Sequence, residues 1–217
     1  MTSLDLFGNL GSEPLRSNIS EQATLFHQFL AKSDDALLTD VRGVLKSAPL
    51  RHLQTPAGHK MSVKSSNCGE YGWLSDSQGY RYQKIDPVTK APWPQMPSLI
   101  KTKAIEVATL AGFENFKPDS CLINVYLPGA KMGLHQDKDE GDFTKPIVSF
   151  SFGLPVNFLW GGFKRSEKYQ KFQLQHTDAL VWGGSDRLRY HGVQQLKDGI
   201  HPVTGRCRVN LTIRQAE

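Results

Sequence analysis

The stretch RVNLTIR, residues 208–214, alternates polar and apolar side chains at every position. In a β-strand, successive side chains point to opposite faces, so its three apolar residues would share one face and its four polar residues the other. We expect the apolar face to be the core side. The opposite face would then place the guanidinium groups of Arg208 and Arg214, with Asn210 between them, inside the fold. A small dicarboxylate ligand would satisfy both guanidinium groups, which are costly to bury alone.

From residue 121 to this stretch, the sequence consists of short strand-like runs separated by turns. The runs are LINVY (122–126), GLHQD (133–137), IVSFSF (147–152), VNFLW (156–160), KFQLQ (171–175), ALVW (179–182) and YHGVQ (190–194). With residues 208–214 they make eight strands. This spacing predicts a double-stranded β-helix, or jelly roll, over about residues 121–217, with two facing sheets and a mouth that can hold a ligand.

The first half of the chain predicts two helices that flank this core, so the fold class is mainly β with added helices (α+β). SDDALLTDVRGVLKSAP, residues 33–49, has Ser33 as a cap, and SLIKTKAIEVATLAGF, residues 98–113, has Ser98 as a cap and Gly112 at its end. Between them, a Gly-, Pro- and aromatic-rich segment at about 60–97 is a candidate lid. We expect residues 1–20 to be a loosely attached arm and residues 21–217 to form one domain.

Composition is that of a soluble globular protein, with 39% hydrophobic and 22% charged residues, and no apolar run approaches the length of a membrane helix. No signal peptide is evident, so we expect a cytoplasmic protein. The cysteines Cys68, Cys121 and Cys207 suggest neither a disulfide framework nor a zinc knuckle. A net charge of +5 favours polyanionic partners. A monomer is expected, because no heptad or exposed apolar strand demands a partner.

A histidine and an aspartate two residues apart, His135 and Asp137, occur in GLHQDKDEGD, residues 133–142. In a strand both would share one face while Gln136 points away. A metal needs a further ligand, and we select His191 because the remaining histidines lie outside strand centres or in the N-terminal third. Two imidazoles and one carboxylate beside open positions suit non-haem Fe(II). The alternative is surface histidines near acids, which are common.

The strand LINVY extends the pocket hypothesis, because Leu122, Asn124 and Tyr126 would share one face. This face offers an amide and a phenol as hydrogen-bonding groups beside the predicted dicarboxylate site. The alternative is that each polar row faces solvent, as one side of many antiparallel sheets does.

These motifs resemble those of the AlkB family of Fe(II)- and 2-oxoglutarate-dependent dioxygenases, which repair alkylated nucleic acid. The resemblance runs from about residue 60 to the C-terminus and is carried by NVY, HQDKDE, VWGGSDRLRYHG and RVNLTIR, and in the lid candidate by NCG, GYRY and PWPQMP. Two positions depart from the expected pattern: Val125 stands where a polar residue would be unsurprising, and Gly133 where serine was expected. Neither is a proposed ligand.

The resemblance implies that His135, Asp137 and His191 bind Fe(II). It implies that Arg208 and Tyr126 hold the distal carboxylate of 2-oxoglutarate. It places Asn124 and Arg214 near the iron-bound end of 2-oxoglutarate, and the remaining positions implied around this cosubstrate are Leu122 and Asn210. Oxygen would be the second cosubstrate. The implied reaction oxidises the methyl group of an N-alkylated base such as 1-methyladenine or 3-methylcytosine in single-stranded DNA, and releases formaldehyde, succinate and CO2.

Substrate contacts also follow from the resemblance, with the damaged base flipped into a pocket. Trp73 and His135 would sandwich the base, and Asp139 would accept a hydrogen bond from its exocyclic amino group. Tyr80, Tyr82 and Arg165 would contact the nucleic-acid backbone. The alternatives are a soluble hairpin tip around Arg165 and a satellite core for the lid aromatics.

Two other functions fit the same residues. One is a 2-oxoglutarate oxygenase that acts on RNA or protein. The other, from a different class, is a non-catalytic nucleic-acid-binding jelly roll that retained its metal cavity. Trp73, Asp139 and the basic loop around Arg165 favour a nucleic base as the substrate, and the intact ligand residues favour catalysis.

Overall fold

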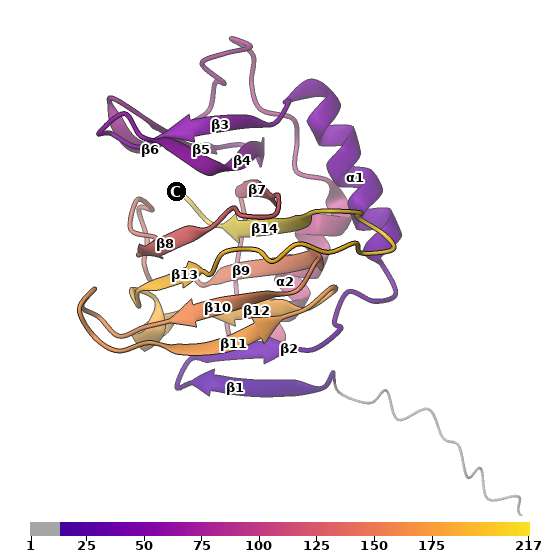
Figure 1. Cartoon of the computed structure of the whole chain (residues 1–217), viewed down its shortest axis with the longest axis vertical. Coiled ribbons are helices and arrows are strands. Elements are labelled where there is room, and N and C mark those ends of the chain that lie inside the picture. The colour runs from indigo at the N-terminus through magenta and orange to yellow at the C-terminus, as the bar shows by residue number, and fades with distance from the viewer. Residues whose placement is uncertain (1–13) are drawn as a thin grey trace, which may run out of the picture.

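The computed structural model describes residues 14–217 and contains two facing β-sheets, a separate hairpin and two helices (Figure 1). All pairings between neighbouring strands of the two facing sheets are antiparallel. The larger sheet has eight strands in the order β1 (Arg16–Ser20), β2 (Ala23–Phe26), β12 (Ala179–Trp182), β9 (Ile147–Gly153), β14 (Arg208–Arg214), β7 (Ser120–Tyr126), β4 (Lys60–Gly69) and β3 (Arg51–Gln54).

The smaller sheet faces the larger one and has four strands. Their order is β11 (Gln170–Leu174), β10 (Val156–Trp160), β13 (His191–Val193) and β8 (Met132–His135). The two sheets together form a jelly roll, and all eight strands predicted from residue 121 onward are confirmed as strands. Two of them are shorter than expected. β13 covers only three of the five predicted residues, and β8 ends at His135 and leaves Asp137 outside the ladder.

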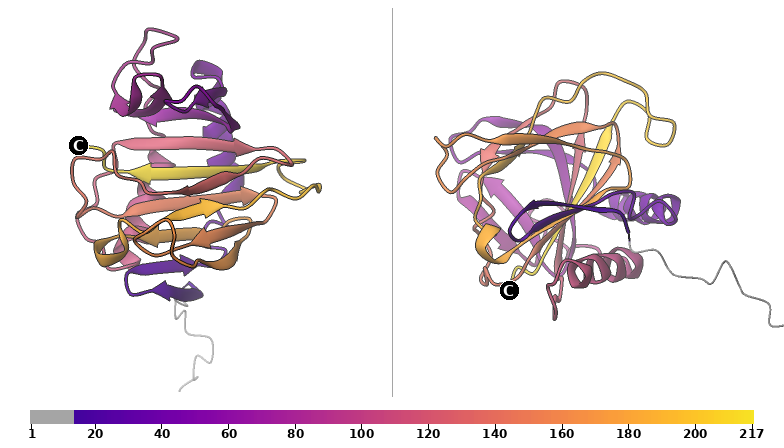
Figure 2. Two further views of the ribbon diagram at one scale, coloured as in Figure 1. Left: turned by 60° about the vertical axis from the view of Figure 1, so that its left-hand side comes forward. Right: turned by 90° about the horizontal axis from the view of Figure 1, so that it is seen from below.

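Both helices, α1 (Asp34–Ser47) and α2 (Ser98–Leu110), lie outside the larger sheet, on the side away from the smaller sheet (Figure 2, right). They cover the apolar face of β14, whose Val209, Leu211 and Ile213 join the same core cluster as side chains of α1 and α2. Ser33 occupies the predicted N-cap position of α1, although its side chain makes no capping bond. The predicted cap of α2 is wrong, because Ser98 is the first residue of the helix and Pro97 is its N-cap.

The N-terminal residues that the structure describes are more ordered than the sequence suggested. Arg16–Ser20 forms β1 and pairs with β2, so the predicted arm is wrong for these residues, whereas residues 1–13 lie outside the described range. Asp186, in the short 3-10 helix Gly184–Asp186, fastens this hairpin. Its buried carboxylate accepts hydrogen bonds from the hydroxyl of Ser20 at 2.6 Å and the backbone N–H of Gln22 at 2.7 Å.

Replacing this carboxylate, in an Asp186→Asn variant, should remove part of the protein's acid sensitivity. Burial opposes ionisation of Asp186, but hydrogen bonds from Arg189, Ser20 and Gln22 outweigh it and lower the pKa below 3.8. A lowered pKa in the folded state stabilises the protein above the unfolded pKa, and this contribution is lost as the pH falls through the folded value. The free energy of unfolding in urea, measured between pH 7 and pH 3, should therefore fall less steeply for the variant. An equal difference between variant and wild type at every pH would contradict this.

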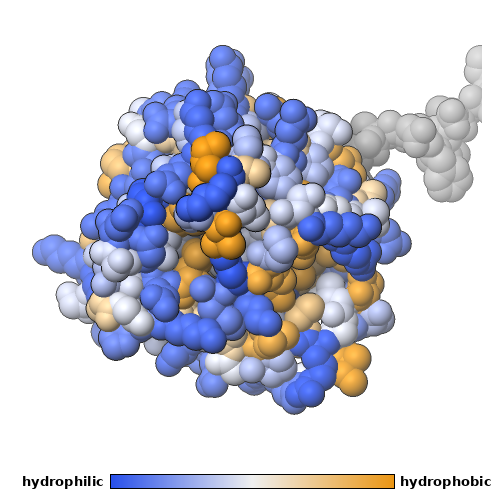
Figure 3. All heavy atoms as spheres, turned by 90° about the horizontal axis from the view of Figure 1, so that it is seen from above, coloured by the Kyte–Doolittle hydropathy of each residue, from blue (hydrophilic) through white to orange (hydrophobic). Residues whose placement is uncertain are grey.

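The candidate lid is only partly separate from the core. β4 belongs to the larger sheet and pairs with β7, so the predicted lid boundary near residue 60 is wrong. β5 (Gly72–Asp76) and β6 (Gly79–Gln83) form a separate two-stranded hairpin, which lies beside β3 and β4 at the upper end of the molecule in Figure 1. Viewed from this side, the surface is mostly hydrophilic with small apolar patches (Figure 3). No helix within residues 14–217 is long and apolar enough to cross a membrane.

Candidate metal centre

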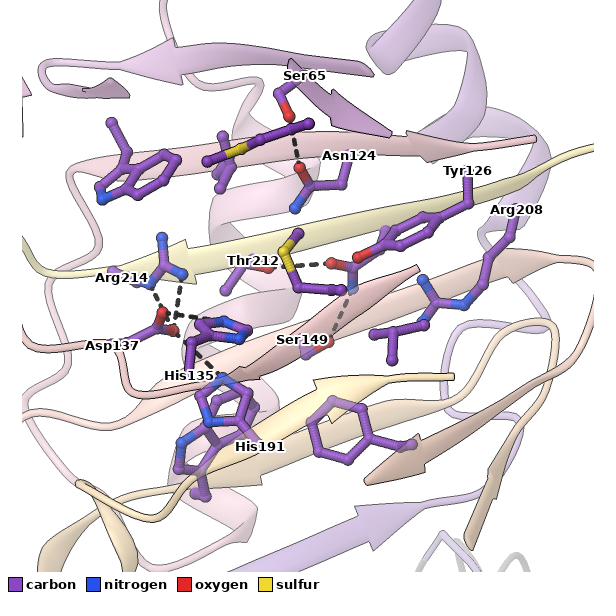
Figure 4. Close-up of a pocket in the computed structure, with 18 residues that line it drawn as sticks. Ser65, Asn124, Tyr126, His135, Asp137, Ser149, His191, Arg208, Thr212 and Arg214 are labelled. Atoms are coloured by element: carbon purple, nitrogen blue, oxygen red, sulfur yellow. Dashed lines mark hydrogen bonds and ion pairs between the residues drawn. The ribbon is translucent and has the colours of Figure 1, made fainter. Parts of the chain in front are cut away.

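A pocket lies between the two sheets (Figure 4), and Trp73 of the β5–β6 hairpin is among the residues that line it. Its larger-sheet wall is formed by the polar faces of β14 and β7, the two strands that the sequence predicted to point inward. Arg208, Asn210 and Arg214 come from β14, while Asn124 and Tyr126 come from β7. Every residue of β14 is buried, so its polar row does not face solvent.

The three predicted metal ligands meet at one end of this pocket. His135 and His191 are opposite each other in the pairing of β8 with β13. Nε2 of His135 lies 3.7 Å from Oδ1 of Asp137, and Nε2 of His191 lies 3.8 Å from Oδ2 of Asp137. One ligand atom from each residue lies within 4.8 Å of the other two. The three side chains lie together as predicted, but not for the predicted reason. Asp137 reaches the histidines from the loop after β8 and not from a strand shared with His135.

Backbone carbonyls orient both imidazoles. Nδ1 of His135 lies 2.9 Å from the carbonyl oxygen of Gly133, and Nδ1 of His191 lies 3.0 Å from that of Arg189. A proton on each Nδ1 would leave Nε2 free to bind a metal, which is a common arrangement in metal sites. Burial, reinforced by His135, lowers the pKa of His191 to about 3, so this ring is neutral at physiological pH. Two imidazoles and one carboxylate fit Fe(II).

Arg214 holds the ligand carboxylate in place. Its Nη2 and Nε donate to Oδ2 of Asp137 at 2.7 and 3.1 Å. Burial alone would raise the pKa of Asp137, but Arg214 and the two histidines hold it well below its ordinary value. The carboxylate therefore remains ionised and available as a ligand.

A buried ion-pair network lies behind this contact and was not predicted. Arg187 Nη2 donates to Oε2 of Glu140 at 2.9 Å, and its Nη1 donates to the backbone oxygen of Asp137 at 2.6 Å. The phenol of Tyr82 donates to Oε1 of Glu140 at 2.6 Å. In the sequence Glu140 is one of four acids in the charged run at residues 137–142, and no local pattern predicts that it is buried.

Removal of this acid in a Glu140→Ala variant should cost about 3–5 kcal/mol of unfolding free energy, because it leaves buried Arg187 without its carboxylate partner. Urea denaturation would measure the loss. The matched control is Arg206→Ala, which breaks the exposed pair with Asp198 (side chains 63% and 62% exposed) and should cost less than about 1 kcal/mol. Equal losses of unfolding free energy in the two variants would show that a buried ion pair is no more costly to break here than an exposed one.

The opposite end of the pocket is suited to a carboxylate. Arg208 is 1% exposed, its Nη2 donates to Oγ of Ser151 at 2.9 Å, and its guanidinium lies 5.4 Å from the ring centre of Tyr126. Its Nε and Nη1 are buried with no hydrogen-bond partner among the residues 14–217. Burial raises the pKa of Tyr126 to about 12, so its phenol stays protonated and can donate. Two orphaned donors beside a phenol fit the distal carboxylate of 2-oxoglutarate.

The remaining predicted cosubstrate residues also line this pocket, but they differ in how many of their hydrogen-bonding groups already have a partner in the protein. Asn124 accepts a hydrogen bond from Ser65 at 2.7 Å through Oδ1. The amide nitrogen of Asn210 donates to Ser149 Oγ at 2.8 Å, and its oxygen accepts from Thr212, so this side chain is occupied with ordering β14 against β9. Leu122 contributes an apolar wall.

Sequence reasoning missed the serines that support this wall. Ser149 and Ser151 in β9 hold Asn210 and Arg208. The signal was present, since polar residues alternate with phenylalanines in IVSFSF, residues 147–152, and all of β9 is buried. A polar row inside a buried strand indicates a polar interior face.

The predicted substrate residues are placed unevenly around the mouth of the pocket. Trp73 lines it, and its indole N–H donates to Oδ2 of Asp139 at 2.8 Å. Tyr80 stacks on Trp73 with ring centres 5.7 Å apart. Tyr82 points inward to Glu140, which does not support the predicted backbone contact. Arg165 lies outside this pocket, with its guanidinium 5.6 Å from the ring centre of Tyr190.

Comparisons with known proteins agree with this geometry. A sequence family described as the 2OG-Fe(II) oxygenase superfamily matches residues 22–214. The α-ketoglutarate-dependent dioxygenase AlkB of Escherichia coli is 47% identical over 213 residues, which cover 98% of each chain. An AlkB homolog of Caulobacter vibrioides is 39% identical over 182 residues, covering 83% of this chain and 81% of the homolog.

More distant relatives extend the comparison. The mouse protein named nucleic acid dioxygenase ALKBH1 is 34% identical over 137 residues, which cover 63% of this chain and 32% of that protein. The solved structure of OsALKBH1 superposes with a TM-score of 0.80 at 26% identity, covering 93% of this chain and all of that one.

Proposed function

Since the chain belongs to the 2OG-Fe(II) oxygenase superfamily, and within it to the AlkB-type α-ketoglutarate-dependent dioxygenases, we propose that it repairs DNA by oxidative demethylation of N-alkylated bases. It is an Fe(II)- and 2-oxoglutarate-dependent dioxygenase that uses O2. The substrate that we assign is 1-methyladenine or 3-methylcytosine in single-stranded DNA. The observation that supports this most strongly is the pairing of a His-Asp-His cluster with the orphaned guanidinium of Arg208 in one pocket.

The residues of the pocket divide the work of the reaction. Iron and 2-oxoglutarate, when bound, supply the oxidising power that hydroxylates the N-methyl carbon. His135, Asp137 and His191 hold the metal, and Arg214 keeps the Asp137 carboxylate ionised and oriented. Arg208 binds the distal carboxylate and so fixes which end of the cosubstrate reaches the metal. The hydroxylated methyl group leaves as formaldehyde, and the base regains its Watson–Crick edge.

A flipped base would enter between the hairpin and the metal ligands. Trp73 and His135 line the same pocket from opposite elements, β5 and β8, which supports the proposal that they sandwich the base. Asp139 already accepts a hydrogen bond from the Trp73 indole. A base amino group would compete for this carboxylate, and its negative charge favours a methylated, cationic ring. We propose that the hairpin acts as the lid over this base.

The test is mass spectrometry of a single-stranded oligonucleotide that carries one 1-methyladenine or 3-methylcytosine, incubated in air with protein, Fe(II), 2-oxoglutarate and ascorbate. Loss of one methyl mass is expected only in the complete mixture, with omission of 2-oxoglutarate as the control. Decarboxylation of 2-oxoglutarate without loss of the methyl group would mean that the iron chemistry is right and the substrate is wrong.

Asp139→Asn should alter base preference rather than the metal site. The variant keeps the shape and still accepts a hydrogen bond from Trp73, but it removes the negative charge near a cationic methylated ring. The kcat/KM for 1-methyladenine should fall by about 10-fold or more, in line with about 1.5–3 kcal/mol for a hydrogen bond to a charged group. Affinity for 2-oxoglutarate, measured in the absence of nucleic acid, should stay unchanged. A loss of cosubstrate affinity would contradict the assignment.

RNA or protein remains the alternative substrate class, and a binding-only role is the alternative function. The aromatic and acidic residues at the mouth favour a base over a peptide, and the mouse relative carries the name nucleic acid dioxygenase. Turnover of methylated DNA, methylated RNA and methylated peptides, compared side by side, separates these substrates. Normal repair by iron-free protein would instead establish the binding role. We also propose a monomer located in the cytoplasm, which size-exclusion chromatography and cell fractionation would test.

A further inference from the structure

A second surface feature lies outside the pocket, at the loop that joins β10 and β11. The loop and its flanks, residues 161–171, read GGFKRSEKYQK and contain four cationic side chains and one acidic side chain. The acid, Glu167, accepts a hydrogen bond from the backbone N–H of Phe163 at 3.2 Å and so holds the loop together. Within residues 14–217 the cations form no ion pair. They are Lys164, Arg165, Lys168 and Lys171.

The same loop exposes two aromatic rings. Phe163 is 50% and Tyr169 is 45% exposed, and neither belongs to an apolar core cluster of the described residues. Each ring has a cation nearby: Arg189 lies 4.7 Å from the ring centre of Phe163, and Lys171 lies 5.7 Å from that of Tyr169. Exposed aromatic rings that do not stabilise the core are candidates for ligand contacts.

An open groove runs beside this loop. Its floor and walls come from Trp160, Gly161 and Gly162 at the end of β10, from residues 167–170, and from Arg189 and Ser20. Arg189 donates to the backbone oxygen of Gly161 at 3.1 Å and is paired with Asp186, so its position in the wall is fixed. Tyr169 is the aromatic side chain that the loop itself contributes to the groove.

The groove is tied directly to the metal site. The backbone N–H of Gly161 donates to the backbone oxygen of Tyr190 at 2.7 Å, and the N–H of Tyr190 donates to the backbone oxygen of Gly162 at 2.9 Å. Tyr190 directly precedes the predicted metal ligand His191. In Figure 1 the β10–β11 loop lies at the same edge of the molecule as the β5–β6 hairpin, with β8 between them. Figure 2, left, brings this side forward. The β10–β11 loop therefore lies at the same edge of the molecule as the hairpin that carries the stacked Trp73 and Tyr80.

We propose that the groove beside Tyr169, with Phe163 and Lys168, is a second nucleic-acid subsite that binds nucleotides more than one position away from the damaged one in a single strand. Single-stranded nucleic acid is held by aromatic rings that stack on bases, combined with cations along the backbone. Tyr169 and Phe163 supply the rings, and Lys168 with its neighbours supplies the cations. The strand passes from the hairpin, across the pocket mouth, to the β10–β11 loop. This inference rests on the proposed function for the identity of its ligand.

The experiment compares turnover by iron-loaded protein of two single-stranded substrates with the same central methylated base, a trinucleotide and an oligonucleotide of about twelve nucleotides. Tyr169→Ala should raise KM for the longer substrate by about 5- to 100-fold, the range expected for loss of one stacked base, with little change in kcat. Turnover of the trinucleotide should match that of wild type. Tyr169→Phe keeps the ring and should restore the wild-type KM.

A second pair of variants tests the contribution of the Lys168 cation to strand binding. Lys168→Ala should weaken binding of the longer strand and reduce by about one the slope of log affinity against log salt concentration. Lys101→Ala, which removes an exposed cation from α2 on the helical side of the molecule, should change neither quantity.

Binding of an unmethylated single strand, measured by fluorescence anisotropy, separates this inference from the proposed function because it needs no catalysis. If wild type demethylates neither substrate but Tyr169→Ala still weakens this binding, the subsite stands and the proposed function falls. If wild type demethylates both substrates and Tyr169→Ala affects them equally or not at all, the subsite is refuted and the proposed function stands. An effect confined to duplex substrates would also overturn the single-strand assignment.

Discussion

An Asp137→Asn variant should lose Fe(II) binding and more than about 10³-fold of its turnover, because a neutral amide replaces the only anionic ligand of the cluster and essential groups that act as a unit have effects of this size or larger. The amide has the shape of the carboxylate, and its oxygen can still accept hydrogen bonds from Arg214. The fold should therefore survive, unlike in Asp137→Ala, which would leave the buried Arg214 short of its partner.

Metal binding is measured by equilibrium dialysis with Fe(II) under anaerobic conditions, and turnover by succinate release. The matched control is Asp198→Asn, an exposed carboxylate paired with Arg206, which should change neither quantity. Stoichiometric iron and wild-type succinate release by Asp137→Asn would remove Asp137 from the metal site.

The second large effect should come from Arg208→Met, which removes the guanidinium that faces the distal end of the pocket. We expect KM for 2-oxoglutarate to rise about 30- to several-thousand-fold, as for loss of about 2–5 kcal/mol when one partner of a buried charge pair is truncated. Arg208→Lys should recover only part of this, because an ammonium group cannot present the planar donors of a guanidinium.

A shorter cosubstrate makes the Arg208 test specific. 2-Oxobutyrate has the oxo-acid end but lacks the distal carboxylate, so wild type and Arg208→Met should use it equally poorly. Arg206→Lys, two residues earlier in an exposed ion pair, is the control for general effects of arginine replacement. If Arg208→Met leaves KM for 2-oxoglutarate unchanged, the orphaned Nε and Nη1 atoms do not mark the carboxylate site.

Both variants depend on β14, whose apolar face packs in the core and whose polar face lines the pocket. Val209, Leu211 and Ile213 pack against the layer of α1 and α2, while Arg208 and Arg214 face the pocket from the ends of the same strand. The burial of the apolar row helps to hold the polar row in register. A one-residue slip would exchange the two faces, so stability of the core and geometry of the site are specified together.

The unpredicted ion-pair network adds a contact between lid and metal site. Tyr82 belongs to the hairpin strand β6, and its phenol donates to Glu140, which also pairs with Arg187 and Arg214. Arg214 in turn holds Asp137. The predicted role of Tyr82 as a backbone contact has no support from this placement, whereas its partner Glu140 contributes to the support of a metal ligand.

Local sequence determined most of the jelly roll and the grouping of the site. Short runs of strand-forming residues separated by turns predicted all eight strands from residue 121 onward. Period-two alternation predicted the inward direction of Arg208 and Asn124, because a strand has only two faces. Both helices were predicted, and Ser33 is the N-cap residue of α1, whereas the N-cap of α2 is Pro97 rather than Ser98. Neither N-cap residue makes a side-chain capping bond.

Tertiary structure alone decided the features that depend on partners distant in sequence. Arg16–Ser20 is a strand only because β2 offers it an edge, and β4 joins the larger sheet only because β7 does the same. Asp137 meets the histidines from a loop because Arg214, 77 residues away, holds its carboxylate. Glu140 looks like any other acid in its charged run until Arg187 and Tyr82 are brought to it. The alternation of side chains follows from the geometry of a single strand, so it can be predicted from local sequence. Strand pairing and the partners of buried charges depend on groups that are distant in the sequence, so only the tertiary structure decides them.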